Sequence, residues 1–344
     1  MKTRISQTLT MQKALLLFNP HAGRRRERRL QDVQAALTVL QDAGVEASAA
    51  PTISASETEE QVRQAITAGC DTVFACGGDG TVHDALQGLV GTQTALGIIP
   101  LGTANGLAHD LGLPFSAAAA ARAALTAVPR RIAVGQISYC DFERKTASRF
   151  FIVTAGVGVD AQVFYELQAG AKSRFGMAAY YAMATRLWLT HQMPEFAVEP
   201  SGKVTDPVVL TDVSQLLAVR IRNFGGLLRE LAPGAGLDRN ELCLVLFRGR
   251  SRLAMLRYVL RGIIGAKWRP CGVEVRQATS VSCSGLSGHG LDASLRSAGQ
   301  PRRLSLRKGG ILVEADGELL GTLPAQISIV PDALTLLAPR GLAA

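Results

Sequence analysis

The sequence predicts an α/β domain followed by a mostly β domain. Up to about residue 130, short apolar runs alternate with segments of helical periodicity, which is the βαβ pattern of a parallel sheet. After residue 131, strand-like runs follow one another with few helices between them, as in an antiparallel β domain. Because 344 residues suffice for two cores, we predict domains at 1–130 and 131–325.

Composition narrows the classes of partner. The chain is 47% hydrophobic, which favours a globular protein, and its formal net charge of +9 suits nucleotide phosphates, an anionic membrane surface or nucleic acid. With only 5% aromatic residues, a base-stacking platform is disfavoured, and we predict no nucleic-acid partner. The six cysteines form no C-x-x-C pair and are interpreted as reduced cytosolic thiols. No signal peptide and no run of 18 apolar residues is found, so we expect a cytoplasmic protein without a spanning segment.

The first domain has four predicted strands and four predicted helices, one of which begins at Thr81 and carries Ala85, Leu86, Leu89 and Val90 on one side. Apolar runs place strands at 14–18, 47–53, 73–76 and 97–100. Helical spacing and glycine stops place helices at 30–40, 57–68 and 116–127. An arginine run precedes the first helix, and we interpret it as a solvated helix face, with attraction to phosphates or headgroups as the alternative: Arg24, Arg25, Arg26, Arg28 and Arg29.

Glycine-rich turns follow three of these strands. The third strand ends in Gly77, Gly78, Asp79, Gly80 and Thr81, and Thr81 can cap the next helix. The fourth strand leads into the turn 101–105, and the first strand into 19–23. Backbone N–H groups at a helix N-terminus attract anions, so such turns can hold phosphates. Neither the dinucleotide fingerprint nor the Walker A pattern is matched, and tight turns without a ligand are the plain alternative.

The second domain has predicted strands at 131–139, 150–154, 216–221, 242–247, 273–275 and 280–283. We interpret 154–160 as a glycine-rich turn into a helix and 327–339 as a final strand. Two helical stretches, 177–188 and 253–267, are candidates for the acceptor side. In the second, Leu256, Val259, Leu260 and Ile263 share one face. Such a helix can lie on an anionic membrane, or it can cover a sheet with its arginines in water; we favour the second arrangement.

These motifs carry a resemblance. Gly-Gly-Asp-Gly-Thr at 77–81, followed by Pro-Leu-Gly-Thr-Ala-Asn at 100–105, resembles the catalytic domain of the diacylglycerol kinase and sphingosine kinase superfamily, and above all the bacterial YegS-like and DgkB-like lipid kinases. The first motif alone is also similar to the NAD kinase pattern. The resemblance spans about residues 14–340. It implies a Rossmann-like three-layer α/β nucleotide-binding domain, a β-sandwich lipid-acceptor domain, a cleft between them, and a tail at 326–344 that packs back on the first domain.

The resemblance also implies roles for residues. ATP and Mg²⁺ are the expected cofactors, and the expected nucleotide-binding residues are Asn19, Pro20, Gly23, Thr52, Gly77, Gly78, Asp79, Gly80, Thr81, Gly102, Thr103 and Asn105. The Asp-Gly-Glu segment at 316–318 corresponds to the family segment that accepts the hydroxyl proton, so Asp316 or Glu318 is the expected base. In sphingosine kinases that role has been given to the acid corresponding to Asp79, which we expect here to orient phosphates or magnesium.

The chain departs from the family pattern at three places. Where relatives carry an Asp-Gly that holds a structural magnesium, this chain has Asp238 and Arg239, and a guanidinium cannot ligate that ion. Either Asp238 substitutes as a metal ligand or Arg239 replaces the ion's charge, and we favour the second. His83 and Gly106 replace an Asn and an Asp that are common in the family.

The expected function is ATP-dependent phosphorylation of a lipid hydroxyl at the inner membrane surface by a peripherally associated protein. Its oligomeric state stays open, with a homodimer as one option. The acceptor stays open among diacylglycerol, a sphingoid base, ceramide and phosphatidylglycerol. Two alternatives remain. One is a soluble-substrate kinase of the NAD kinase sort, and the other is a non-catalytic nucleotide or lipid sensor, motivated by His83, Gly106 and Arg239.

Overall fold

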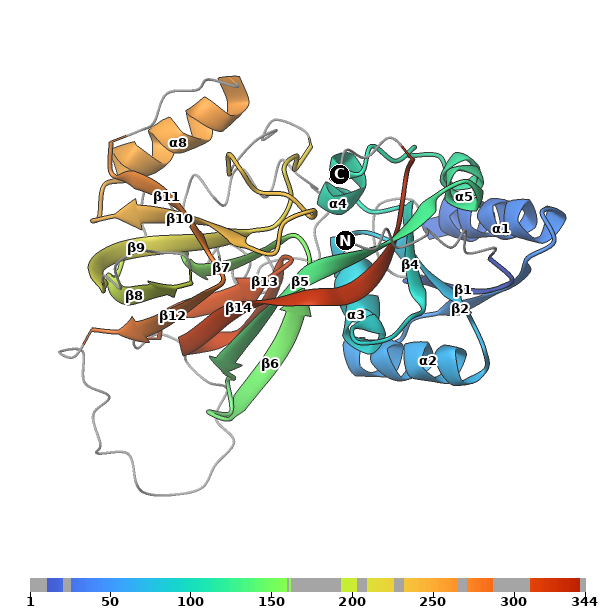
Figure 1. Ribbon diagram of the computed structural model, residues 1–344, viewed down its shortest axis with the longest axis horizontal. Helices are drawn as coiled ribbons and strands as arrows, with labels where there is room; N and C mark the ends of the chain where they lie inside the picture. The colour runs from blue at the N-terminus through green and yellow to red at the C-terminus, as the bar shows by residue number, and fades with distance from the viewer. Residues whose placement is uncertain are drawn as a thin grey trace, which may run out of the picture.

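The computed structural model describes residues 11–20, 26–159, 161, 193–202, 209–225, 232–264, 271–286 and 310–340. It has a helix-covered N-terminal part and a strand-rich C-terminal part (Figure 1). The hydrogen-bonded strands of both parts form one continuous path, β11-β10-β9-β7-β13-β14-β4-β3-β1-β2. Gly23, Arg24, Arg25, Asp160 and the segment 177–188 lie outside the described residues.

The N-terminal sheet consists of four parallel strands. In spatial order they are β2 (Glu46–Pro51), β1 (Lys13–Phe18), β3 (Thr72–Gly77) and β4 (Ala95–Pro100). Every position of β3 and β4 is buried, as expected for strands covered on both faces. Three helices connect these strands: α1 (Arg26–Asp42), α2 (Ala55–Thr67) and α3 (Asp79–Leu89). Two more follow β4, namely α4 (Gly106–Asp110) and α5 (Ala117–Leu125).

Alternate residues of this sheet pack on opposite sides. On one face, Val73 and Leu96 meet Val62 of α2 and Leu86 of α3. On the other, Phe74 and Ile99 of the sheet share a cluster with α1 and α5 residues. Figure 1 shows the corresponding layers, with α2 and α3 on one side and α1 and α5 on the other. The carboxyl ends of β1, β3 and β4 therefore point to one edge of the sheet, where the glycine turns lie.

Two long strands connect the N-terminal sheet to the C-terminal strands. β14 (Glu318–Ala338) runs parallel to β4 at Thr335 and Leu336, and β5 (Val128–Cys140) pairs antiparallel with β14 along most of its length. The register shifts between Val330 and Leu334, where the strand passes from one part to the other. Residues 325–328 pair instead with β12, so only the last part of the predicted tail joins the first sheet.

The C-terminal part is antiparallel. It contains β6 (Thr146–Phe151), β7 (Thr154–Gly158), β8 (Phe196–Ser201), β9 (Leu210–Val219), β10 (Leu242–Arg248), β11 (Val273–Ala278), β12 (Ser280–Gly285) and β13 (Leu312–Ala315). Its core is made of aliphatic side chains of these strands and of β5 and β14, together with the aromatic rings of Phe151, Phe196 and Tyr139. β13 and β14 form a hairpin closed by Asp316 and Gly317, both with positive φ, as in the type I′ turn that an Asp-Gly pair favours.

Three sequence-based interpretations are wrong. Residues 154–158 form strand β7, paired with β9 and β13, rather than a turn, because two neighbouring strands satisfy their backbone. Arg29 in the arginine run is buried rather than solvated. Helix α8 (Arg252–Ile264) exposes Leu256 and Leu260 and buries Arg261, which inverts the predicted orientation. Among the described helices none is both long and apolar enough to cross a bilayer.

Candidate functional site

The two glycine turns after β3 and β4 pack directly against each other. The carbonyl oxygen of Gly77 accepts hydrogen bonds from the N–H groups of Leu101 (2.9 Å) and Gly102 (3.1 Å). A Cβ built on Gly102 would lie 2.3 Å from the Cα of Gly78, so this backbone approach requires glycine. A Cβ on Gly77 would likewise lie 2.2 Å from the buried Thr81 hydroxyl oxygen. The turns therefore form one backbone surface at the N-terminus of α3.

Asn105 and Asp79 hold this surface in shape. Asn105 adopts the left-handed conformation (φ 51°), and its side-chain amide exchanges two hydrogen bonds with the backbone of Gly102, at 3.0 and 2.9 Å. The Asp79 carboxylate accepts from the N–H groups of Gly106 (3.0 Å) and Leu107 (3.3 Å), so it links α3 to the first turn of α4. Burial raises the pKa of Asp79, and those two amides oppose the rise while the charge of Asp316 adds to it.

Arg29 ties the turn after β1 to the turn after β4. Its guanidinium donates to the carbonyl oxygens of Asn19 and Leu101, each at 3.0 Å. Its burial lowers the pKa of the guanidinium, and the charge of Asp32 opposes that effect. Thr52 lies beside the same turn, because its N–H donates to the carbonyl oxygen of Phe18 at 2.8 Å. Asn19, Pro20 and Thr52 are thereby brought to the edge that carries Gly77–Thr81.

Asp316 is buried and fully engaged. One carboxylate oxygen accepts from the N–H groups of Val153 (2.8 Å) and Thr154 (3.0 Å), and the other from Ile152 (3.1 Å). The second oxygen also lies 3.3 Å from Nδ1 of His83, which is itself buried. Such a carboxylate anchors the β13–β14 hairpin to the bend between β6 and β7, and its lone pairs are occupied by donors.

Glu318 lies two residues farther on and is exposed to solvent. Glu318 lies close to the glycine turn after β3, since a Cβ built on Gly80 would lie 3.0 Å from the Glu318 carboxylate oxygen. The protein around Glu318 raises its pKa by desolvation, the charge of His83 lowers it, and the carboxylates of Asp84 and Asp316 raise it further. Asp79, Asp316 and Glu318 come from distant parts of the chain and lie near one another, with the accessible carboxylate of Glu318 beside the N-terminus of α3.

His83 and Gln87 join helix α3 to the second domain. Burial works to lower the pKa of His83, but the hydrogen bond and charge of Asp316, with the charges of Asp84 and Glu318, outweigh it and the pKa is raised. The Gln87 amide donates to the carbonyl of Phe150 at 2.9 Å and accepts from the Phe150 N–H at 3.0 Å. The sequence pattern placed Arg29 only in a solvated arginine run and indicated no role for Gln87, because nothing local distinguishes either from surface residues.

The residues at the predicted structural metal position do not fit a metal. Asp238 pairs with the Arg222 guanidinium rather than with Arg239. The fully buried Arg220 donates to the carbonyl oxygens of Arg239 (2.8 Å) and Glu241 (2.7 Å). No group of three or more His, Cys, Asp or Glu side chains suited to a metal ion occurs in the part of the chain that the structure describes.

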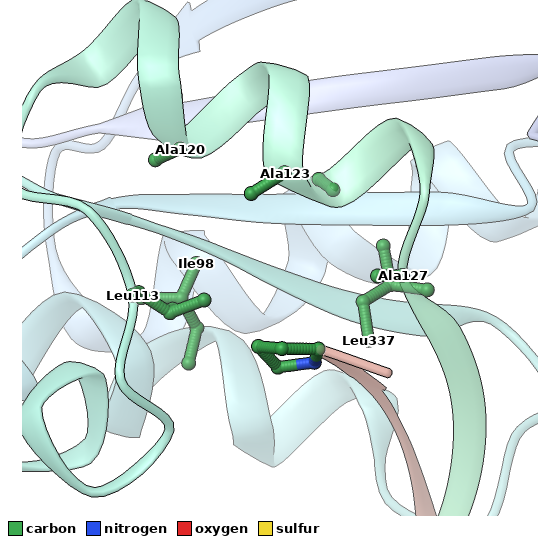
Figure 2. A pocket seen from close by; sticks show the side chains of 8 residues that line it. Ile98, Leu113, Ala120, Ala123, Ala127 and Leu337 are labelled. Carbon is green, nitrogen blue, oxygen red and sulfur yellow. The ribbon is translucent and has the colours of Figure 1, made fainter. Parts of the chain in front are cut away.

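A separate pocket lies between α5, β4 and the end of β14, and none of these acids lines it (Figure 2). Its lining side chains are all apolar: Ile98, Leu113, Ala120, Ala123, Ala124, Ala127, Leu337 and Pro339. Without a polar group to orient a substrate, we assign the chemistry to the turns and Glu318 rather than to this pocket.

Comparison with known proteins identifies the family. The diacylglycerol kinase catalytic domain matches residues 13–137, and the YegS C-terminal NAD kinase beta sandwich-like domain matches residues 153–338. The chain belongs to the diacylglycerol kinase family. It is accordingly classed among the lipid kinases, and the family implies ATP as the phosphoryl donor and, usually, a divalent metal ion. This confirms the resemblance inferred from the two glycine motifs.

Relatives cover most of the chain. A protein named diacylglycerol kinase from Mycobacterium tuberculosis (strain CDC 1551 / Oshkosh) is 27% identical over 330 residues, covering 95% of this chain and 96% of the relative. One from Bacillus subtilis (strain 168) is 26% identical over 258 residues, covering 74% and 80%. A crystal structure of a diacylglycerol kinase from Bacillus anthracis str. Sterne has a TM-score of 0.65 at 18% identity, covering 99% and 100%. That similarity supports the overall fold, including a β-rich C-terminal domain.

Proposed function

We propose that the protein transfers the γ-phosphate of ATP to the hydroxyl group of a membrane lipid, with diacylglycerol as the first acceptor to test. One observation carries this proposal: the Glu318 carboxylate lies against Gly80, at the N-terminus of the helix that follows the glycine turn. An accessible carboxylate beside an anion-binding helix end is the arrangement that phosphoryl transfer to an alcohol requires. The names of the relatives support diacylglycerol over the other lipid acceptors.

The proposed ATP site consists of the turns after β1, β3 and β4, which contact one another or share Arg29. The close packing of Gly78 on Gly102 keeps side chains away from the N-terminus of α3, so phosphate oxygens can approach the first N–H groups of that helix, which have no partner within it. Arg29 fixes the spacing between the turns at Asn19 and Leu101. We therefore propose that Gly77–Thr81, Gly102, Thr103 and Asn105 bind ATP, and that Asn19, Pro20 and Thr52 border the same site.

The acceptor side rests on the difference between two carboxylates. Asp316 is enclosed by three N–H groups and His83, so we give it a positioning role. Glu318 is accessible and its pKa is raised, which suits a group that takes a proton from an alcohol. Magnesium, when bound, neutralises phosphate charge. Mg²⁺ is commonly held by one or two carboxylates beside the phosphates; Asp79, at the N-terminus of α3, and Asp84 of the same helix would hold it here, while Glu318 keeps the role of base.

The test is transfer of labelled γ-phosphate to a panel of diacylglycerol, sphingoid base, ceramide and phosphatidylglycerol in mixed micelles, with NAD as a soluble acceptor. Labelled diacylglycerol supports the proposal, and labelling of another lipid changes the acceptor only. Labelling of NAD without detergent would instead favour a kinase for a soluble substrate. Folded protein that binds ATP and labels nothing would favour the sensor alternative.

A pH profile tests the proposed base. The base must be ionised, so kcat/KM is expected to fall as pH drops through a pKa above the ordinary glutamate value. The positive charge of His83 lowers the pKa of Glu318, so His83→Asn, which keeps a nitrogen donor near Asp316, should move the acid limb to higher pH. Thermal melts at the same pH values control for altered stability. An acid limb that stays in place or moves to lower pH would contradict the role of this carboxylate.

A further inference from the structure

Helix α8 carries an exposed apolar stripe. Leu253, Leu256, Leu260 and Ile264 are 51%, 37%, 42% and 71% exposed, and their spacing of three, four and four residues puts them on one side of the helix. They are four of the nine exposed large hydrophobic residues in the described part of the chain. Scattered exposed leucines are ordinary, but a stripe along three turns of one helix indicates an interaction surface.

The opposite side of α8 already has its packing partners. Ala254 and Tyr258 are buried, and the Tyr258 ring meets Phe247 of β10 edge-on at a centroid distance of 5.1 Å. The Arg261 guanidinium lies 5.5 Å from the centre of the same ring. The helix is therefore held to β10 and β11 by its aromatic and small residues, and the leucine stripe is not required to cover that sheet.

The charges around the stripe are basic. The helix sequence contains three arginines and no acid, and Arg252 and Arg257 are exposed on either side of the stripe. Arg250, just before the helix, is also exposed, with Glu195 as an ion-pair partner at 3.4 Å. Figure 1 places α8 on the outside of the C-terminal strands, at the end of the molecule away from α1 and α2. An apolar stripe with arginines beside it complements an anionic bilayer, in which leucines enter the acyl boundary and guanidinium groups meet phosphates.

We infer that α8 docks the protein on anionic membranes, lying in the bilayer surface with Leu253, Leu256, Leu260 and Ile264 inserted. The inference rests on the proposed function, which requires the enzyme to meet a lipid that stays in a bilayer. Since no described helix can span a membrane, this surface supplies a reversible mode of attachment.

The experiment measures binding of the full chain to vesicles by co-sedimentation. The vesicles are phosphatidylcholine alone or phosphatidylcholine with phosphatidylglycerol. Leu256→Gln/Leu260→Gln should weaken binding to the anionic vesicles at least ~10-fold, because two apolar side chains no longer leave water. The matched control is Leu30→Gln, an exposed leucine on helix α1, which should bind as the native chain does. Arg257→Gln should lower binding to anionic vesicles ~5-fold and leave binding to neutral ones unchanged.

A second measurement separates docking from catalysis. On a short-chain, water-soluble diacylglycerol, the double leucine variant should phosphorylate as fast as the native chain, whereas on long-chain diacylglycerol in anionic vesicles it should lose at least ~10-fold in rate. Leucine-dependent vesicle binding with no lipid phosphorylated would support docking and reject the proposed function.

Three results would overturn the inference. The first is vesicle binding by the double leucine variant that equals that of the native chain, and the second is no vesicle binding by the native chain. The third is a native dimer in lipid-free solution that Leu256→Gln/Leu260→Gln converts to a monomer in analytical ultracentrifugation. That result would assign the stripe to a second copy of the chain.

Discussion

Glu318→Gln is expected to lower kcat by ~10²–10⁴-fold, the usual contribution of a positioned general base. The amide keeps the size of the side chain but cannot take the acceptor's proton. Because Glu318 is exposed, the substitution should leave the folded protein intact. ATP affinity should also change little, since the glycine turns and not this carboxylate are proposed to bind the nucleotide. The measurements are steady-state kinetics on the accepted lipid, ATP binding by calorimetry and thermal melting.

Asp316→Asn is the matched control, because it changes the neighbouring acid in the same way. An asparagine there points an NH₂ group at backbone N–H donors, so at least one donor in the Ile152–Thr154 bend loses its acceptor. This variant should lose stability by ~1–3 kcal/mol, and its activity should fall because the hairpin that carries Glu318 shifts. The roles would be reversed if Glu318→Gln kept full activity and Asp316→Asn lost activity without losing stability.

The different roles of Asp316 and Glu318 follow from the geometry of the β13–β14 hairpin. Both lie within one Asp-Gly-Glu segment, and the tight turn sends Asp316 toward the bend between β6 and β7 while Glu318 begins the next strand. The backbone donors that engage Asp316 belong to residues more than 150 positions earlier. The sequence alone could therefore identify the segment as acidic and turn-like but could not say which carboxylate is enclosed.

The strands and turns of the N-terminal half could be predicted because each follows from residues that are neighbours in the sequence. Strands buried on both faces are continuous apolar runs, as β3 and β4 are, and each is followed by a glycine turn and a helix. Helix α8 shows the limit of that reasoning. Periodicity identifies which residues share a stripe, but whether the leucines or Tyr258 and Arg261 face the sheet depends on Phe247, which lies on another element. The burial of Arg29 could not be predicted for the same reason, since its two hydrogen-bond acceptors lie on separate turns.

Arg220→Leu is expected to cost ~3–5 kcal/mol of folding free energy, the range for loss of one member of a buried charged network. The guanidinium is fully buried, and it donates to the carbonyl oxygens of Ala133 (3.0 Å), Arg239 and Glu241. These three acceptors belong to β5 and to the segment before β10, so one side chain joins two parts of the domain. Burial lowers its pKa to about 10, with the charge of Asp238 opposing, and the group stays charged at neutral pH.

Denaturant unfolding followed by fluorescence measures this cost, and Arg222→Leu is the control. Arg222 is half exposed and pairs with Asp238 at the surface, so its loss should cost at most ~1 kcal/mol. Since Arg220 supplies the cation among these carbonyls, chelating divalent ions should leave the unfolding midpoint of the native chain unchanged. If a chelator destabilised the native chain as much as Arg220→Leu does, a metal ion rather than this guanidinium would hold the segment, because a guanidinium cannot be removed by chelation.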